Sequence, residues 1–517
     1  MAALEAMNFK KKRRYLKFKF QMDYIKKITE SILHNQDCNA LFINNRYYSY
    51  KTFALCISNI RHAIENTIPF EEKLIGLVTN DDIETYASII ALWLEGKAYV
   101  PVNPEFPLER NLEIFRLTET KYILNSSTTN VYDNFNVINT REKQNANINL
   151  TPKSVDGEAL AYILFTSGTT GVPKGVPITF NNVQALVNAI DAEPTFNLNN
   201  TDKCLQMFEL TFDFSVVTYL FPFLAGSCIY TIPKGKIKYF YIFKLLKEQH
   251  LTVLTMVPSI INYLRPYFPE INATSVRYCS FGGGALHEDI AKAWSDCLPN
   301  CKIFNYYGPT EFTVYSGFYP YHKENHTKAY NGVISIGTPQ KDTLYLVVDK
   351  QNKEVPIGIP GELCLAGPQI TPGYWNNEEK NKSSFFYHNI NGSNERFYKT
   401  GDLCIKDEDG DYLYVGRADF QVKIRGYRVE LGEVEYHVKK VITNHNFVVL
   451  DIDNSSGNNE LYLIIESDTF KYEHIINYLK EKLPNYMVPT QIRFIDNIPH
   501  SINGKIDRKQ LRNTFYS

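Results

Sequence analysis

The chain is 517 residues long and has a mass of 59.7 kDa, which is too large for one hydrophobic core and predicts two or more domains. The hydrophobic fraction of 44% and the charged fraction of 21% are typical of a globular protein. The formal net charge of −1 argues against a nucleic-acid-binding protein, whose surface would be basic. No apolar run approaches the roughly 18 residues of a membrane-spanning helix, so no membrane insertion is expected. Nine cysteines without a C-x-x-C pair favour a reducing, cytoplasmic location.

The first 25 residues are rich in positive charge, with the run KKKRRYLKFKF at residues 10–20. Such a run suits a membrane surface, a nucleic acid, a solvated helix start or a flexible tail, and the last two are the more common. Residues 1–25 are therefore predicted to be a basic N-terminal extension.

Up to about residue 330, apolar runs alternate with amphipathic helical patterns. The run KLIGLVTN at residues 73–80 predicts a strand, and residues 82–102 predict a helix followed by a second strand. This rhythm indicates an α/β domain of layered parallel sheets. Short strands and turns at residues 331–416 indicate a small β-barrel subdomain. We expect a large N-terminal domain over residues 26–417 and a smaller α+β domain over residues 418–517.

A loop with phosphate-binding chemistry follows a predicted strand that begins at Ile163. In ILFTSGTTGVPKGVPITF, residues 163–180, a series of hydroxyl groups and glycines leads to Lys174. Backbone N–H groups, hydroxyl donors and one cation together suit a polyanion such as a nucleotide phosphate. The P-loop template G-x-x-x-x-G-K-[ST] does not match, because two residues separate Gly171 from Lys174. An ordinary glycine-rich connection is the alternative at this point.

Four more stretches follow in order along the chain. They are NYYGPTEFT at residues 305–313, YKTGDL at 398–403, GRADFQVKIRGYRVELGEVE at 416–435 and SINGKIDRKQL at 501–511. Taken singly, each is compatible with a turn, a surface loop or a solvated face. Together with the glycine-rich loop, they resemble the motifs of the adenylate-forming superfamily, which includes acyl-CoA synthetases, luciferase-type enzymes and amino-acid adenylation domains.

The resemblance implies an ATP-dependent, AMP-forming ligase that uses Mg²⁺. A substrate carboxylate attacks the α-phosphorus of ATP and pyrophosphate leaves, so positioning and electrostatics carry much of the catalysis. Thr166 and Lys174 would act on the phosphates, and Glu311 would hold Mg²⁺, which prefers oxygen ligands. Asp402 matches the family's ribose-binding aspartate, with Arg417 near the same sugar. The residues implied for ATP or AMP are Thr166, Ser167, Gly168, Thr169, Thr170, Gly282, Gly283, Gly284, Asn305, Tyr306, Tyr307, Gly308, Thr310, Asp402, Arg417 and Lys505.

The resemblance also assigns the base contacts and the catalytic cation. Asn305 matches the asparagine that contacts adenine, and Tyr307 matches the ring that stacks on it. Lys505 matches the family's catalytic lysine, whose ammonium bridges the substrate carboxylate and the α-phosphate. Because Lys505 lies in the C-terminal domain, that domain is expected to be mobile. It would rotate about the hinge residue Asp419, so that residues 423–427 face a thioester-forming tunnel.

The stretch LTFDFSVV, residues 210–217, bears on the acyl donor. This stretch resembles the corresponding one of amino-acid adenylation domains, which have an aspartate at the position of Asp213. In those domains the carboxylate pairs with the α-ammonium of the substrate. The alternative is that Asp213 is the N-cap of the following helix, since aspartate is a favoured cap. The other residues of the implied pocket are uncharged, which favours an uncharged substrate side chain. The substrate-binding residues implied by the resemblance are Asp213, Phe214, Val217, Thr255, Ser280, Gly282, Tyr306, Val314 and Tyr315.

Three residues of this pocket are bulky: Phe214, Tyr306 and Tyr315. They either fill the pocket and leave room for a small side chain, or stack on an aromatic one. The sequence alone leaves both alternatives open.

No carrier domain follows the motif at residues 501–511. We therefore expect the amino acid to be transferred to the phosphopantetheine of a separate carrier protein supplied in trans. This organisation resembles that of stand-alone amino-acid:carrier protein ligases such as D-alanine ligases. One alternative is an acyl- or aryl-CoA ligase, and another is a catalytically silent nucleotide-binding protein on the same fold.

Overall fold

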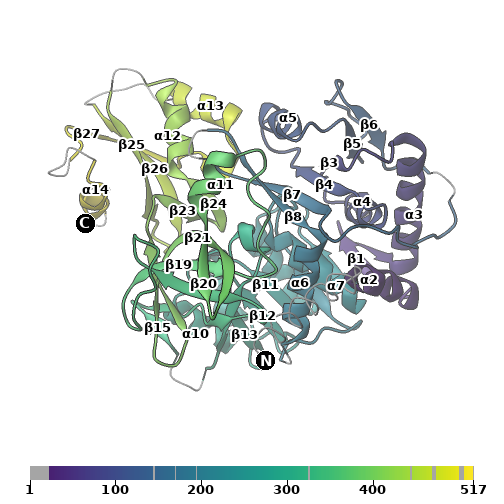
Figure 1. The fold of residues 1–517 in the computed structure, drawn as a ribbon, viewed down its shortest axis with the longest axis horizontal. Helices are drawn as coiled ribbons and strands as arrows, with labels where there is room; N and C mark the ends of the chain where they lie inside the picture. Colours follow the sequence, from purple (N-terminus) through teal and green to yellow (C-terminus); the bar gives the residue numbers. More distant parts are fainter. Residues whose placement is uncertain are drawn as a thin grey trace.

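The computed structural model describes residues 23–143, 146–168, 171–193, 195–323, 327–442, 445–467, 473–499 and 506–515. These residues form a large α/β part, a β-rich part and a smaller C-terminal part (Figure 1). The predicted fold class is therefore confirmed, while the predicted boundaries at residues 25 and 417 remain predictions. Most of the basic extension lies outside the described residues, as do Thr169, Thr170 and Lys505.

A nine-stranded sheet forms one half of the large part, with the order β17-β14-β13-β12-β11-β9-β10-β1-β2. Its strands from β13 to β1 pair in parallel, whereas β2, β14 and β17 pair antiparallel at the two edges. Parallel strands covered on both faces appear in a sequence as short continuous apolar runs. The bounds are β1 Asn39–Ile43, β2 Arg46–Ser49, β9 Lys203–Gln206, β10 Cys228–Thr231, β11 Val253–Met256, β12 Tyr278–Phe281, β13 Lys302–Tyr307, β14 Gly317–Tyr321 and β17 Thr338–Pro339.

A six-stranded sheet with the order β6-β5-β3-β4-β7-β8 forms the other half. The predicted strand–helix–strand unit is confirmed, because α4 connects β3 to the parallel strand β4. Strands β7 and β8 pair antiparallel, and the glycine-rich loop joins them. The bounds are β3 Leu74–Val78, β4 Ala98–Val102, β5 Tyr122–Asn125, β6 Asn136–Asn139, β7 Leu160–Thr166 and β8 Lys174–Thr179.

Helices α4 and α7 are apolar on nearly all sides and lie in the core that both sheets share. A helix that is apolar all round has to be buried. The hydroxyl groups of Tyr99 on β4 and Tyr219 on α7 are 2.7 Å apart, which joins the two halves. The helices of the large part are α2 Asp23–His34, α3 Tyr50–Thr67, α4 Ile83–Leu94, α5 Leu108–Leu117, α6 Phe180–Asp191, α7 Phe214–Ala225, α8 Lys238–Gln249, α9 Pro258–Leu264, η1 Arg265–Glu270, α10 Glu288–Cys297 and η2 Thr310–Phe312.

The β-rich part follows the nine-stranded sheet in the chain. It contains the small pair β15–β16 and an antiparallel sheet with the order β18-β19-β21-β20, to which β22 adds beside β21. The elements are β15 Ala329–Tyr330, β16 Val333–Ile334, β18 Leu344–Val348, β19 Gly361–Ala366, α11 Glu378–Ser384, β20 Phe385–Ile390, β21 Ser393–Lys406 and β22 Tyr412–Arg417.

The C-terminal part has apolar clusters of its own, centred on residues such as Val434, Leu463 and Leu479. It lies at one end of the molecule, above the β-rich part in Figure 1. The hairpin of β23 and β24 leads into this part and points toward the large one. The elements are β23 Gln421–Ile424, β24 Tyr427–Glu430, α12 Leu431–Lys439, β25 Phe447–Asp453, β26 Asn459–Glu466, α13 Glu473–Lys482, η3 Asn485–Met487, β27 Gln491–Ile495 and α14 Arg508–Phe515.

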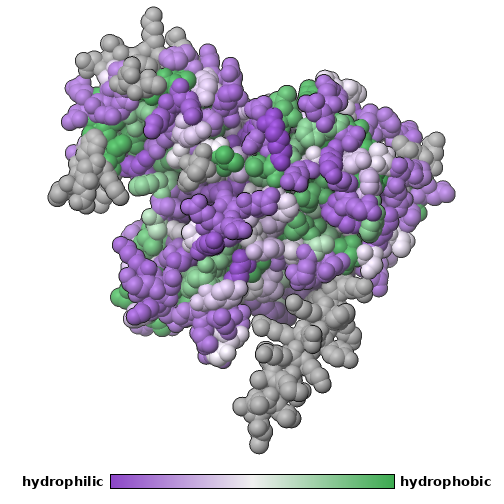
Figure 2. Space-filling view, turned by 45° about the horizontal axis from the view of Figure 1, so that its top comes forward, coloured by the Kyte–Doolittle hydropathy of each residue, from purple (hydrophilic) through white to green (hydrophobic). Residues whose placement is uncertain are grey.

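The face of the molecule in Figure 2 is largely hydrophilic, with apolar side chains in scattered groups. Within the described ranges, none of the helices combines the length and the apolar character that crossing a membrane requires.

Candidate active site

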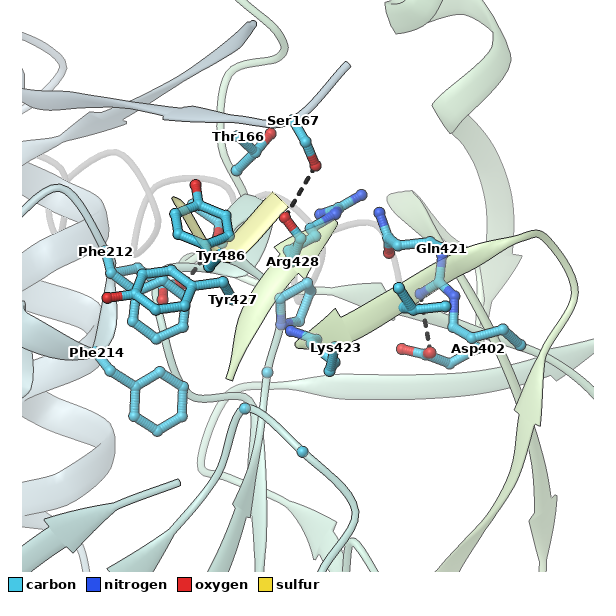
Figure 3. A pocket seen from close by; sticks show the side chains of 18 of the residues that line it. Thr166, Ser167, Phe212, Phe214, Asp402, Gln421, Lys423, Tyr427, Arg428 and Tyr486 are labelled. Atoms are coloured by element: carbon cyan, nitrogen blue, oxygen red, sulfur yellow. Dashed lines mark hydrogen bonds and ion pairs between the residues drawn. The ribbon is translucent and has the colours of Figure 1, made fainter. Parts of the chain in front are cut away.

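A cavity of about 610 Å³ lies where β7, α7, the loop after β12 and the end of β13 meet the β23–β24 hairpin. Figure 3 shows Phe212, Phe214 and Tyr427 on one side of this cavity and Asp402 on the other. Segments that are far apart in the sequence therefore converge on one space. The predicted site residues that line it are Thr166, Ser167, Asp213, Phe214, Gly283, Gly284, Asn305, Tyr306, Tyr307, Gly308, Thr310, Asp402, Arg417 and Asp419.

Asp213 stands just before α7, yet its geometry is not that of a helix cap. Its backbone is helical, with φ −62° and ψ −31°, whereas an N-cap residue is usually extended. The N–H groups of Ser215 and Val216 donate to the backbone carbonyls of Phe212 and Asp213. The Asp213 carboxylate instead accepts a hydrogen bond of 2.8 Å from Thr310 Oγ1. Burial raises its pKa, and the Thr310 hydrogen bond opposes that shift.

Asp402 holds a network on the opposite side of the cavity. Tyr307 Oη donates to Asp402 Oδ2 at 2.5 Å, and Arg417 Nη1 donates to Oδ1 at 2.9 Å. Burial, followed by the charge of Asp402, raises the pKa of Tyr307 well above its usual range, so the phenol stays a donor. The Asn305 side-chain amide donates to the Ser335 carbonyl at 2.9 Å. A carboxylate has about four lone-pair sites, so Asp402 can still accept from the hydroxyls of a sugar.

The glycine-rich loop is engaged by carboxylates of the C-terminal part. Lys174 Nζ lies 3.0 Å from Glu430 Oε1, and the Gly168 N–H donates to Glu433 Oε2 at 2.8 Å. The Ser167 hydroxyl receives the Glu430 N–H at 3.1 Å. Carboxylates and phosphates are both anions that accept from N–H groups and lysine. In this arrangement two glutamates are the anionic partners of the loop, and its binding of nucleotide phosphates stays a prediction.

Glu311 is fully buried and paired with an arginine that the sequence did not assign. Arg428 Nη1 lies 2.8 and 2.9 Å from its two carboxylate oxygens, and the Tyr374 hydroxyl donates to it at 2.6 Å. Burial raises the pKa of Glu311, but the charge of Arg428 and the Tyr374 hydrogen bond outweigh burial and lower it to about 2. The carboxylate is thus ionised near neutral pH.

The surroundings of Glu311 test the predicted Mg²⁺ ligand. The described part of the chain contains no group of three His, Cys, Asp or Glu side chains that could hold a metal ion. Mg²⁺ is commonly held by one or two carboxylates together with substrate phosphates and water. Glu311 offers one ionised carboxylate for such a pattern, and the charge of Lys174 from the glycine-rich loop also lowers its pKa. Its role as a Mg²⁺ ligand stays a prediction.

The predicted substrate pocket is divided in the structure. Phe214 and Tyr306 line the large cavity. A second cavity of about 20 Å³ is lined by the remaining predicted residues Val217, Thr255, Ser280 and Tyr315, with Tyr306 shared by both cavities. Neither cavity is lined by Gly282 or Val314.

Comparison with known proteins identifies the family. Residues 29–375 match the model of the family described as AMP-binding enzyme. The chain belongs to this family. The predicted membership of the adenylate-forming superfamily is therefore confirmed, as is the predicted class of AMP-forming ligases.

This AMP-binding enzyme is similar to parts of much larger bacterial proteins. It is 32% identical over 449 residues to tyrocidine synthase 3 of Brevibacillus parabrevis, covering 85% of this chain and 7% of that protein. It is 30% identical over 453 residues to gramicidin S synthase 1 of Brevibacillus brevis, covering 85% of this chain and 40% of that protein. The chain thus spans less than half the length of these curated relatives.

Two solved structures share its fold. One is the Vibrio cholerae adenylation domain AlmE in complex with glycyl-adenosine-5'-phosphate, with a TM-score of 0.84, 24% identity, and coverage of 96% of this chain and 98% of that one. The other is holo-PA1221, a protein containing adenylation and PCP domains, with a TM-score of 0.82, 22% identity, and coverage of 94% of this chain and 83% of that one.

Sequence reasoning missed several residues with which this AMP-binding enzyme closes its site. Arg428, Glu430 and Glu433 belong to a stretch whose alternating charges are typical of a solvated surface, and nothing in that pattern names their partners. Glu433 is fully buried and also pairs with Arg110 at 2.7 Å. Lys423 lines the large cavity. Desolvation, followed by the charge of Arg428, lowers the pKa of its ammonium group.

The C-terminal motif that contains Lys505 is described only from residue 506 onward. Ile506 packs against the apolar cluster of the C-terminal part. Arg508 pairs with Glu435 at 2.6 Å. Lys505 itself lies outside the described residues, so its catalytic role stays a prediction.

Proposed function

We propose that this enzyme activates an amino acid with an uncharged side chain as its aminoacyl adenylate and then transfers it to the phosphopantetheine of a carrier protein. The buried Asp213 carboxylate in the cavity wall carries this proposal. A buried carboxylate needs a cationic partner, and Thr310 offers only a neutral hydrogen bond. The positive charge of Lys423 also lowers the pKa of Asp213. Lys423 belongs, however, to the β23–β24 hairpin, which would move when the C-terminal domain rotates about Asp419. An α-ammonium is the partner that a substrate can supply.

In the first step, an oxygen of the substrate carboxylate forms a bond to the α-phosphorus of ATP. The bond from that phosphorus to the bridging oxygen breaks, and pyrophosphate leaves with the electron pair. Lys505 would neutralise the charge that develops between the carboxylate and the α-phosphate. The N–H groups and hydroxyls of the glycine-rich loop, with Lys174, would receive the pyrophosphate. Mg²⁺ would be held by Glu311 and phosphate oxygens and would offset their charge.

In the second step, the thiol sulfur of phosphopantetheine attacks the carbonyl carbon of the adenylate, AMP leaves, and the thiol proton passes to solvent. The observed position of the β23–β24 hairpin supports this step. With pyrophosphate gone, Glu430 and Glu433 can take the donors of the loop, and Arg428 can neutralise Glu311. The presence of adenylation and PCP domains in PA1221 also supports a carrier as the acceptor. The nine cysteines are free thiols, which fits the proposed cytoplasmic location.

The test is ATP–pyrophosphate exchange with a panel of amino acids and with the corresponding carboxylic acids that lack the amino group. We expect exchange with at least one amino acid and little with its des-amino analogue. Equal or better exchange with the simple acids would support an acyl- or aryl-CoA ligase instead. Adenylate formed from the best amino acid is then offered to a phosphopantetheinylated carrier protein and to free CoA, and only the carrier should become loaded efficiently.

A further inference from the structure

The position of Asp213 sets the direction in which a substrate side chain must point. If Asp213 holds the ammonium, the α-carboxylate has to face the nucleotide side of the cavity, where Asn305, Tyr307 and Asp402 lie. The side chain is then directed away from the nucleotide. We take Phe214, which follows Asp213 in the chain, and Tyr306 as the wall that it meets, because both line the cavity and both belong to the predicted substrate pocket.

This wall is a packed layer of rings. The rings of Tyr306 and Tyr315 are stacked, with centroids 4.2 Å apart and an interplanar angle of 20°. Phe214 meets Tyr315 edge-on at 5.3 Å. Phe212 stacks on Phe214 at 5.7 Å and 11°, and Figure 3 shows these two side chains next to each other at the cavity. The rings are therefore engaged with one another, which disfavours the stacking of an aromatic substrate between them.

Gly282 shows how far the Phe214 ring extends. A Cβ atom added at Gly282 would lie only 2.3 Å from Cζ of Phe214. The ring thus reaches from the start of α7 to the backbone at the end of β12 and closes the cavity there. Behind it, Val217, Thr255 and Ser280 line the second cavity, whose 20 Å³ is about the space of one water molecule.

We propose that the substrate's side chain is no larger than a methyl group, so that glycine and alanine are the amino acids activated. This rests on the proposed function, because it takes Asp213 as the ammonium partner. It adds that Phe214, Tyr306 and Tyr315 determine the size of the side chain. A longer side chain would have to pass this wall and enter the second cavity, which is too small to accept it.

The wild-type enzyme tests the proposal directly. ATP–pyrophosphate exchange is measured with glycine, L-alanine, D-alanine, L-valine, L-leucine and L-phenylalanine, and with the des-amino analogue of each. We expect kcat/KM for glycine or one of the alanines to exceed that for the three larger amino acids by about 100-fold, because a closed pocket rejects extra carbon atoms by up to about 200-fold each. Preference for valine, leucine or phenylalanine would overturn the size limit and leave amino-acid activation standing. Exchange with des-amino acids alone would overturn both.

Two variants locate the cause of the size limit. Phe214→Ala removes the ring that meets Gly282, and the ratio of valine to glycine kcat/KM should rise about tenfold or more. Tyr315→Ala, which opens the way toward the second cavity, should shift the same ratio and serves if the first variant is unstable. Tyr319→Ala is the matched control, because this buried tyrosine lines neither cavity. The proposal is overturned if both pocket variants melt cooperatively and support ATP–pyrophosphate exchange with glycine, yet keep the wild-type ratio of valine to glycine kcat/KM. The ring layer would then not determine the size of the substrate side chain.

Discussion

Replacing Asp213 by asparagine removes one negative charge from the cavity and changes the shape of the side chain little. Asp213 is only 4% exposed, so an ammonium bound to it is desolvated. A hydrogen bond between charged groups contributes about 1.5–3 kcal/mol, and a buried charge left without its partner costs roughly 3–5 kcal/mol. At about 1.36 kcal/mol per factor of ten, the larger range predicts a loss of roughly 10²- to 10⁴-fold in kcat/KM for the amino acid.

The assay is ATP–pyrophosphate exchange at saturating ATP with the amino acid varied. ATP affinity should stay unchanged, because Asp402, Arg417 and the glycine-rich loop are untouched. The amide carbonyl introduced by Asp213→Asn can still accept from Thr310, so the melting temperature should move little. Since burial raises the pKa of Asp213, wild-type kcat/KM should fall as the pH drops toward that raised value, and the variant should lose this dependence. Near-wild-type kcat/KM in the variant would refute the ammonium role.

Three further variants address the two half-reactions. Lys505→Ala should slow adenylate formation by orders of magnitude with little change in ATP affinity, because the charge is needed only as the transition state forms; near-normal exchange would show that the assignment is wrong. Asp419→Pro fixes the backbone at the hinge and should impair one half-reaction far more than the other, measured as exchange and as carrier loading; equal losses would contradict domain rotation. Arg428→Met should leave exchange nearly intact but slow single-turnover transfer to the carrier about tenfold or more, because the variant loses one hydrogen bond between charged groups. Unchanged transfer would argue against a role for the Arg428–Glu311 pair.

Local sequence patterns predicted the helices and strands well, but they predicted poorly which residues far apart in the chain contact one another. The strand–helix–strand unit at residues 73–102 followed from its continuous apolar runs, because β3, α4 and β4 are buried along nearly their whole length. The contact of Glu433 with the Gly168 N–H joins residues that are 265 positions apart, and no periodic signal specifies it. The charged run of residues 416–435 is compatible with several domain orientations, so its partners depend on which one forms. Bulky residues in the pocket were evident from the sequence, but whether their rings pack on one another depends on side-chain directions.

The two glutamates on the glycine-rich loop affect how ATP affinity has to be interpreted. A carboxylate and a phosphate cannot accept from the same Gly168 N–H at once. If the loop receives the phosphates of ATP as proposed, ATP would bind only to molecules in which the C-terminal part has moved away. The apparent dissociation constant is the intrinsic one divided by the fraction of such molecules, which makes binding about tenfold weaker if one molecule in ten is open. A substitution that loosens docking, such as Glu433→Gln, would then tighten apparent ATP binding without adding any contact to the nucleotide. Titrations of ATP against docking variants would therefore measure the free-energy difference between the two domain arrangements.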